Sequence, residues 1–134
     1  MKKKRVIILV IIAVVIIGVY FGITGIMSRI ETSLKQLSDM PITNVDLSKV
    51  LDGTYTGSYE VFLVAADVKV IVKNHKILDI ELVKHNNGQG AAAESIPDKV
   101  VKAQTLEVDI VSSATYSSKV ILKAIENALN SANK

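Results

Sequence analysis

The chain has 134 residues, of which 49% are hydrophobic and none is cysteine. This length is enough for one modest domain, and the lack of cysteine excludes both disulfides and a lipoprotein attachment thiol. The formal charge of +3 is unevenly spread: four of the sixteen basic residues lie at positions 2–5, which leaves twelve basic against thirteen acidic residues, a charge of −1, in the remainder. Nucleic-acid binding needs clustered basic residues, so no nucleic-acid partner is expected.

The first predicted element is a transmembrane helix. A basic cytoplasmic tail at residues 1–5 precedes an uncharged run at residues 6–26, which spans about 31 Å as a helix. A cleaved signal peptide is the alternative, but the run exceeds the usual signal-peptide core and no clear cleavage site follows it. The positive-inside rule places the N-terminus in the cytoplasm and the C-terminal domain outside. The sequence therefore predicts a single-pass protein of the cell membrane, with the lipid bilayer as a partner.

Residues 27–50 are predicted to form a stalk and a linker. Apolar residues recur at helical spacing from Ile30 to Leu37, so the membrane helix should continue as an amphipathic stalk and stop before Pro41. The folded domain should then occupy residues 51–134.

Alternating apolar and polar residues predict an antiparallel sheet. Residues 53–64 suit a strand, or a bent strand pair broken near Gly57. Two further alternating runs follow at residues 68–73 and 78–83. The Asn74-His75 pair between them suits a tight turn, so the two runs should form a β-hairpin.

Helices are predicted in the C-terminal half of the chain. Residues 91–94 and 97–103 look helical, and residues 108–111 are expected to form a short final strand. From residue 119 onward, apolar residues repeat every three or four positions, which marks one buried face of a helix. Together these elements predict an α+β fold: a small antiparallel sheet with helices on one face, preceded by the transmembrane helix.

The segment from Asp109 to Ser117, D-I-V-S-S-A-T-Y-S, carries most of the functional information. It groups several hydroxyls directly before the C-terminal helix. A helix leaves its first N–H groups unpaired and is partly positive at that end, so an anionic phosphate would be stabilised there. Taken alone, Ser117 could instead be the N-cap of an ordinary helix.

This segment resembles the D-x-x-S-G-A-T-x-[S/T] signature of the FMN-binding domain family, which includes flavin subunits of sodium-pumping and Rnf-type electron-transfer complexes. Ser113 stands where the family usually has glycine. The run Asp52-Gly53-Thr54-Tyr55 is also similar to the D-G-x-Y run of the family. Five residues match the signature: Asp109, Ser112, Ala114, Thr115 and Ser117.

The resemblance implies FMN as the cofactor. In many members a separate flavin transferase links FMN, through a phosphoester, to the last hydroxyl of the signature, which is Ser117 here. Ser112 and Thr115 would donate hydrogen bonds to the phosphate or the ribityl chain, and Asp109 would fix the turn by accepting backbone N–H bonds. Tyr116 could lie against the flavin or pack into the core, and the alternation of an extended segment favours core packing. Ser113 and Ala114 complete the implied cofactor-binding segment.

The segment His85–Gly90 has no periodicity and contains two glycines, so it is predicted to be a loop that can approach a ligand closely. The resemblance implies that this loop, with His85 and Gly88, faces the flavin ring. A plain connecting loop is the alternative.

Other chemistries have little support in the sequence. Two histidines without cysteine give no metal-ligand spacing, and no G-x-S-x-G elbow accompanies the serines, so neither a metal site nor a catalytic triad is expected. This fits a carrier, because a flavin supplies the redox chemistry itself.

The predicted function is that of a membrane-anchored extracytoplasmic protein that carries FMN, covalently on Ser117, between membrane or envelope redox partners. Two alternatives remain open: non-covalent FMN in the same domain, and a membrane-tethered adaptor in which Ser113 has made the flavin pocket degenerate.

Overall fold

The computed structural model describes all residues except 87, 89, 133 and 134. They divide into two compact units, residues 1–33 and residues 34–134. The helices and strands, in chain order, are α1 (Lys2–Asp39), η1 (Leu47–Lys49), β1 (Gly53–Val61), β2 (Val64–Lys73), β3 (Lys76–Asn86), η2 (Ala91–Ser95), α2 (Ile96–Ala103), η3 (Ser112–Ala114) and α3 (Thr115–Ser131), where η marks a 3₁₀ helix.

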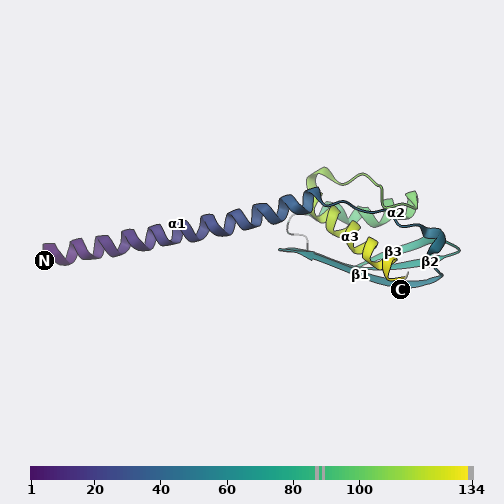
Figure 1. Cartoon of the computed structure of the whole chain (residues 1–134), viewed down its shortest axis with the longest axis horizontal. Coiled ribbons are helices and arrows are strands. Elements are labelled where there is room, and N and C mark those ends of the chain that lie inside the picture. The colour runs from purple at the N-terminus through teal and green to yellow at the C-terminus, as the bar shows by residue number, and fades with distance from the viewer. Residues whose placement is uncertain (87, 89, 133–134) are drawn as a thin grey trace. The chain divides into compact units, whose positions relative to one another are not determined.

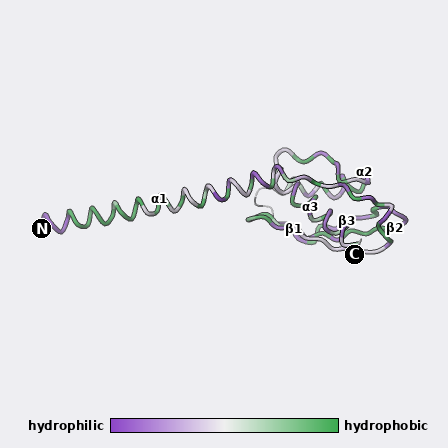
Figure 2. The backbone as a smooth tube through the Cα atoms, viewed as in Figure 1, coloured by the Kyte–Doolittle hydropathy of each residue, from purple (hydrophilic) through white to green (hydrophobic). Residues whose placement is uncertain are grey.

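The first unit is the apolar part of α1, which Figure 2 colours hydrophobic over most of its length. Its side chains at residues 6–26 are all exposed. A helix that is apolar all round is stable only in apolar surroundings. Among the described residues, α1 is the one helix long and apolar enough to cross a membrane, and it ends at Asp39, before Pro41, as expected.

The second unit contains a three-stranded antiparallel sheet in the order β1-β2-β3 (Figure 1). The predicted hairpin is confirmed as β2 and β3. Its turn residues, Asn74 and His75, have φ angles of 50° and 59°, the left-handed pair that a tight primed turn requires. Their backbone conformation matches the right-handed twist of the two strands.

β1 runs unbroken through Gly57, so of the two predicted alternatives the single strand is confirmed and the break near Gly57 is absent. A Cβ atom at Gly57 would lie 2.1 Å from the Ala124 carbonyl oxygen and 2.4 Å from the Ala128 nitrogen. The glycine is therefore needed because α3 crosses β1 in direct backbone contact, a close approach that any side chain would prevent.

α2 and α3 pack against one face of the sheet, as Figure 1 shows, which confirms the predicted α+β class. The hydrophobic core lies between the two layers. Its largest fully buried side chains on these strands and helices are Val68, Val70, Val72, Ile96, Val100, Val120, Ile121, Leu122, Ile125 and Leu129. The helix predicted from residue 119 onward is confirmed as α3, which begins four residues earlier, at Thr115.

Residues 108–111 do not form the expected strand. Their backbone atoms bond to helix side chains instead of to a sheet edge. The Lys99 ammonium donates to the Asp109 carbonyl at 3.2 Å, and the Val111 N–H donates to Ser118 Oγ at 3.1 Å. The valines of this segment suit a strand, but tertiary contacts decide their conformation.

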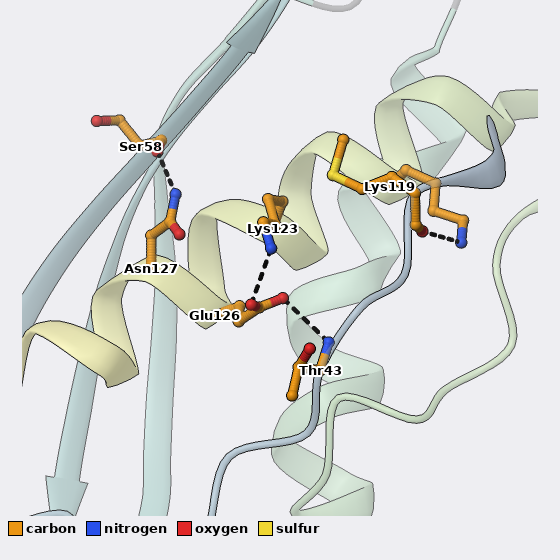
Figure 3. Close-up of polar contacts among 7 residues, drawn as sticks. Thr43, Ser58, Lys119, Lys123, Glu126 and Asn127 are labelled. Carbon is orange, nitrogen blue, oxygen red and sulfur yellow. Dashed lines mark hydrogen bonds and ion pairs between the residues drawn. The ribbon is translucent and has the colours of Figure 1, made fainter. Parts of the chain in front are cut away.

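Residues 34–50, expected to be stalk and linker, are packed within the second unit, where Leu37 and Val50 are buried in the core. Polar contacts hold the linker along α3 (Figure 3). The Lys119 ammonium donates to the Met40 carbonyl at 3.0 Å, and the Thr43 N–H donates to the Glu126 carboxylate at 3.1 Å.

Further along the linker, Asp46 caps η1. Its carboxylate accepts hydrogen bonds from the hydroxyl and the backbone N–H of Ser48, and these two bonds lower the pKa of Asp46. The bonds favour the ionised carboxylate, so the cap is strongest above the ordinary pKa of an aspartate.

Candidate functional site

A cavity of about 490 Å³ lies at the N-terminal end of α3. This volume is within the range of small-molecule and cofactor sites. Six consecutive residues, 112–117, form one side of it, and the last turn of α1, the start of β2 and the residue before η2 form the rest. The lining residues are Ser38, Val64, Gly90, Ser112, Ser113, Ala114, Thr115, Tyr116 and Ser117.

Ser117 is the third residue of α3, not its N-cap. The N-cap position is occupied by Ala114, which makes no side-chain capping bond, and Thr115 is the first residue of the helix. The alternative interpretation, that Ser117 merely caps the helix, is therefore wrong. Capping of α3 does not explain why residue 117 carries a hydroxyl.

The adjacent hydroxyls of Ser117 and Ser118 differ in their bonding. Both residues are buried, at 2% and 0% exposure. Ser118 Oγ accepts the Val111 N–H, whereas the Ser117 hydroxyl makes no hydrogen bond within the described part of the chain, although it lines the cavity. The one fully buried side-chain polar atom without a partner in the described residues is His85 Nε2, so the Ser117 hydroxyl keeps access to the cavity, where a ligand can bond it.

The remaining hydroxyls of the segment are more accessible. Thr115 is half-buried, and its Oγ1 donates to the Ser112 carbonyl at 3.3 Å, a long hydrogen bond. Ser112 and Ser113 are exposed and lie in η3. Ser113 is not among the described residues that adopt a positive φ, so the backbone there does not require the glycine of the family signature.

Two expected roles differ from the structure. Tyr116 does not pack into the core but is 40% exposed and lines the cavity, because the segment is helical and the alternation of an extended chain does not apply. The Asp109 side chain is exposed and, within the described residues, accepts no backbone N–H bond. Ser118 Oγ accepts the Val111 N–H and so fixes the turn.

His85 lies at the end of β3 that is nearest to the cavity. It pairs with the fully buried Ala66 of β2, and cross-strand partners share a face, so His85 is on the helix-covered face of the sheet. Its side chain is only 3% exposed, and Nδ1 lies 3.1 Å from the Glu94 carboxylate. Nε2 is buried without a hydrogen-bond partner among the described residues. His85 is not a lining residue of the cavity.

The loop after β3 is only partly described, because Asn87 and Gln89 lie outside the described residues. Gly88 is exposed and has a φ of 56°, a conformation that favours glycine. It does not line the cavity, whereas Gly90 does. Gly90 is thus the loop glycine with backbone next to the site.

The chemistry of the lining suits a phosphate group. Ser112, Ser113, Thr115 and Ser117 provide hydroxyl donors beside the N-terminal end of α3, where the helix is partly positive. The described residues that line the cavity include no carboxylate, which suits an anionic ligand. The described residues include no cluster of three or more His, Cys, Asp or Glu that could hold a metal ion.

Comparison with known proteins identifies this ligand. The family model of the FMN-binding domain matches residues 65–130, which include β2, β3, α2, the cavity-lining segment 112–117 and most of α3. These residues belong to the FMN-binding domain family. FMN is accordingly the cofactor, and the hydroxyl-rich, carboxylate-free lining fits its phosphate.

A longer oxidoreductase contains a similar stretch. The protein described as NADH:acrylate oxidoreductase from Vibrio harveyi is 32% identical over 100 residues, which are 72% of this chain but 9% of that protein. The chain thus spans less than a tenth of the length of the relative it matches. The similarity supports flavin binding in electron transfer for this FMN-binding domain.

Three residues that line the cavity were not predicted from the sequence: Ser38, Val64 and Gly90. Gly90 belongs to a segment that the sequence marks as a ligand-facing loop, so a signal for it existed. Val64 and Ser38 carry no such signal, because one begins an ordinary strand and the other lies in a helix that continues the membrane segment.

Proposed function

We propose that the protein is a membrane-anchored, extracytoplasmic electron carrier whose FMN is covalently attached to Ser117. The observation that carries this proposal is the Ser117 hydroxyl, which lines the cavity and has no hydrogen-bond partner in the described structure, within a segment that matches an FMN-binding family. When bound, FMN supplies the redox chemistry. The protein supplies its position and its electrostatic environment.

Ser117 Oγ would form the ester with the FMN phosphorus. The phosphorus belongs to an activated flavin nucleotide bound by a flavin transferase. As the ester bond forms, the bond from phosphorus to the rest of that nucleotide breaks, the rest departs as the leaving group, and a base of the transferase takes the hydroxyl proton. Ser112, Ser113 and Thr115 would donate hydroxyl hydrogen bonds to the remaining phosphate oxygens. Ala114 is small and nearly buried, so it lets the backbone approach the phosphate closely, and Tyr116 offers an aromatic ring at the edge of the cavity.

His85 is proposed as a further contact of the cofactor. Its imidazole is held by Glu94 through Nδ1, and its buried Nε2 has no partner among the described residues, so it can bond a ligand group. Gly88 and Asp109 are assigned weaker roles: both are exposed, and neither lines the cavity. Gly88 would shape the loop, and Asp109 would position the segment before η3 through its backbone carbonyl, which Lys99 holds.

The exterior location rests on the sequence of α1, whose basic start and apolar run favour a cytoplasmic N-terminus and an exterior C-terminal domain. Covalent attachment has a use there, because a dissociable cofactor is lost wherever its free concentration falls below its dissociation constant. The partners would be redox proteins or carriers of the membrane or envelope.

Mass spectrometry tests the linkage. The full chain is expressed with and without a flavin transferase, and the tryptic peptide of residues 103–119 is weighed. We expect an added FMN mass only with the transferase, its loss in Ser117→Ala and its retention in Ser117→Thr. An adduct that persists in Ser117→Ala would move the acceptor to Thr115 or Ser118.

Two other outcomes correspond to the alternative functions. Visible flavin absorbance that is lost on denaturation, without a modified peptide, indicates non-covalent FMN. No flavin absorbance at all indicates the tethered adaptor. Protease added to intact spheroplasts tests the topology separately, because an exterior domain is cut there, whereas a cytoplasmic one is cut only after the membrane is opened.

A further inference from the structure

The turn between β1 and β2 exposes two large apolar side chains. Val61 pairs with Val64, so Phe62 and Leu63 form a two-residue turn between the strands. Phe62 is 49% exposed and Leu63 is 72% exposed. Figure 2 colours this turn hydrophobic, in contrast to the polar Asn74-His75 turn at the other end of β2.

The backbone of this turn is also unusual for its residues. Phe62 has a φ of 55°, in the left-handed region that a bulky side chain rarely adopts and that glycine or asparagine would occupy without strain. An apolar pair at such a position neither favours the turn nor reaches the core. Strained, exposed apolar residues of this kind are typical of a contact surface.

The position of the turn within the second unit indicates what it contacts. Val64, the residue after the turn, lines the same cavity as Ser38. Ser38 lies four residues after the start of this unit, so the turn is at the end of the unit where the chain enters it. Ser38 is only twelve positions after Ile26, the end of the apolar run, which is roughly 18 Å of helix.

We infer that the Phe62–Leu63 turn inserts into the interfacial layer of the bilayer that holds α1, so that the cofactor cavity lies close to the membrane surface. This inference rests on the proposed membrane span. The short tether keeps the turn at a high effective concentration near the lipid, so two apolar side chains suffice for contact.

The nearest charged residues on either side of the turn are Glu60 and Asp67, both acidic. Lys84 of β3 pairs with Asp67, so these three residues carry a net charge of −1, which does not attract anionic lipid, and the contact depends on apolar burial. A redox partner that fits this position of the cavity is one that reaches it from the plane of the membrane.

The absence of tryptophan from the chain allows a direct test. The full-length variant Phe62→Trp is reconstituted into phosphatidylcholine vesicles, with or without brominated acyl chains. We expect blue-shifted emission and quenching on the order of two-fold by the brominated lipid. The comparison between the two vesicle types cancels any quenching by the flavin. Leu63→Trp is the second reporter in case Phe62→Trp does not fold.

Leu78→Trp is the matched control. Leu78 is 54% exposed and lies next to the β2–β3 turn, so roughly eight residues, or about 26 Å of strand, separate it from the Phe62–Leu63 turn. Its emission should be the same in both vesicle types. Flotation of the vesicles first establishes whether the chain is membrane-bound.

The outcomes separate the two proposals. If none of the variants floats with the vesicles, the membrane span fails and the inference fails with it. If they float but Phe62→Trp and Leu63→Trp are no more quenched than Leu78→Trp, the span holds and the inference is overturned. The turn would then be free to contact a protein.

Discussion

The two ends of α3 differ in how their polar side chains are hydrogen-bonded. Near the C-terminal end, the buried Glu126 carboxylate is bonded at both oxygens, by the Lys123 ammonium at 2.8 Å and the Thr43 N–H at 3.1 Å (Figure 3). At the N-terminal end, the Ser117 hydroxyl lines the cavity and has no such partner within the described residues. The C-terminal part of α3, where Glu126 is bonded within the protein, is called the closed end. The N-terminal part, where Ser117 lines the cavity, is called the open end.

The two ends of α3 also differ in how closely they pack against the rest of the unit. The closed end lies in direct backbone contact with β1 at Gly57, whereas the open end borders a cavity of about 490 Å³. Stability and ligand binding are thus separated along α3. Substitutions at the closed end should change the free energy of unfolding, whereas at the open end substitution of the cavity-lining Ser117 should change flavin loading.

Gly57→Ala is expected to have the largest effect on stability. The new Cβ would lie 2.1 Å from the Ala124 carbonyl oxygen, so α3 must move away from β1. Overpacking of this kind costs about 3 kcal/mol or more when backbone atoms have to shift. Urea denaturation of the second unit measures the loss.

Gly53→Ala is the control for that substitution. A Cβ there would approach only the side chain of Tyr55, at 3.3 Å from its hydroxyl oxygen, and this ring can move slightly. The loss should stay below about 1 kcal/mol. Equal losses for the two glycines would contradict the close contact between α3 and β1.

Glu126→Ala should have the next largest effect. It removes the acceptor of both the Thr43 N–H and the Lys123 ammonium, which costs about 1–3 kcal/mol for partly buried groups. Glu126→Gln keeps an acceptor and should lose less. For comparison, Glu81→Ala removes an exposed ion pair with Lys69 and should cost no more than about 1 kcal/mol. A larger loss in Glu81→Ala would show that burial does not decide these energies.

How far the sequence predicts this arrangement depends on the range of the interactions. The β2–β3 hairpin and α3 could be predicted, because alternation and helical periodicity are local signals. The role of Gly57 could not, since a glycine in a strand indicates either a bend or a close approach, and the choice depends on Ala124 and Ala128, some seventy residues later. The strand expected at residues 108–111 failed because local β-propensity ignores the helix side chains that bind this segment.

The candidate site shows the same limit. The segment 112–117 was predicted as one block, and all six of its residues line the cavity, because its hydroxyls are adjacent in sequence. Ser38 and Val64 come from other elements and meet this segment only in the folded unit. The orientation of Tyr116 was misjudged because the start of α3 was placed too late in the sequence.

Ser118→Ala should have a moderate effect. It leaves the half-buried Val111 N–H without its acceptor, at a cost of about 1–2 kcal/mol. The covalent adduct should remain, because the acceptor oxygen is unchanged. Thermal unfolding of the variant, together with the mass of the peptide of residues 103–119, checks both expectations. An unchanged unfolding midpoint would show that this hydrogen bond contributes nothing.

Ser117→Ala should have the smallest effect on the fold and the clearest effect on the cofactor. Its hydroxyl makes no hydrogen bond in the described structure and does not cap α3, so its removal should change the free energy of unfolding of the flavin-free protein by less than about 0.5 kcal/mol. The adduct should be lost completely. The free energy of unfolding is measured side by side for the flavin-free wild type, Ser117→Ala and Ser118→Ala. This comparison separates the contribution of the hydroxyl from that of the cofactor. If Ser117→Ala loses as much stability as Ser118→Ala, both hydroxyls are structural, and the open end of α3 does not differ from the closed one.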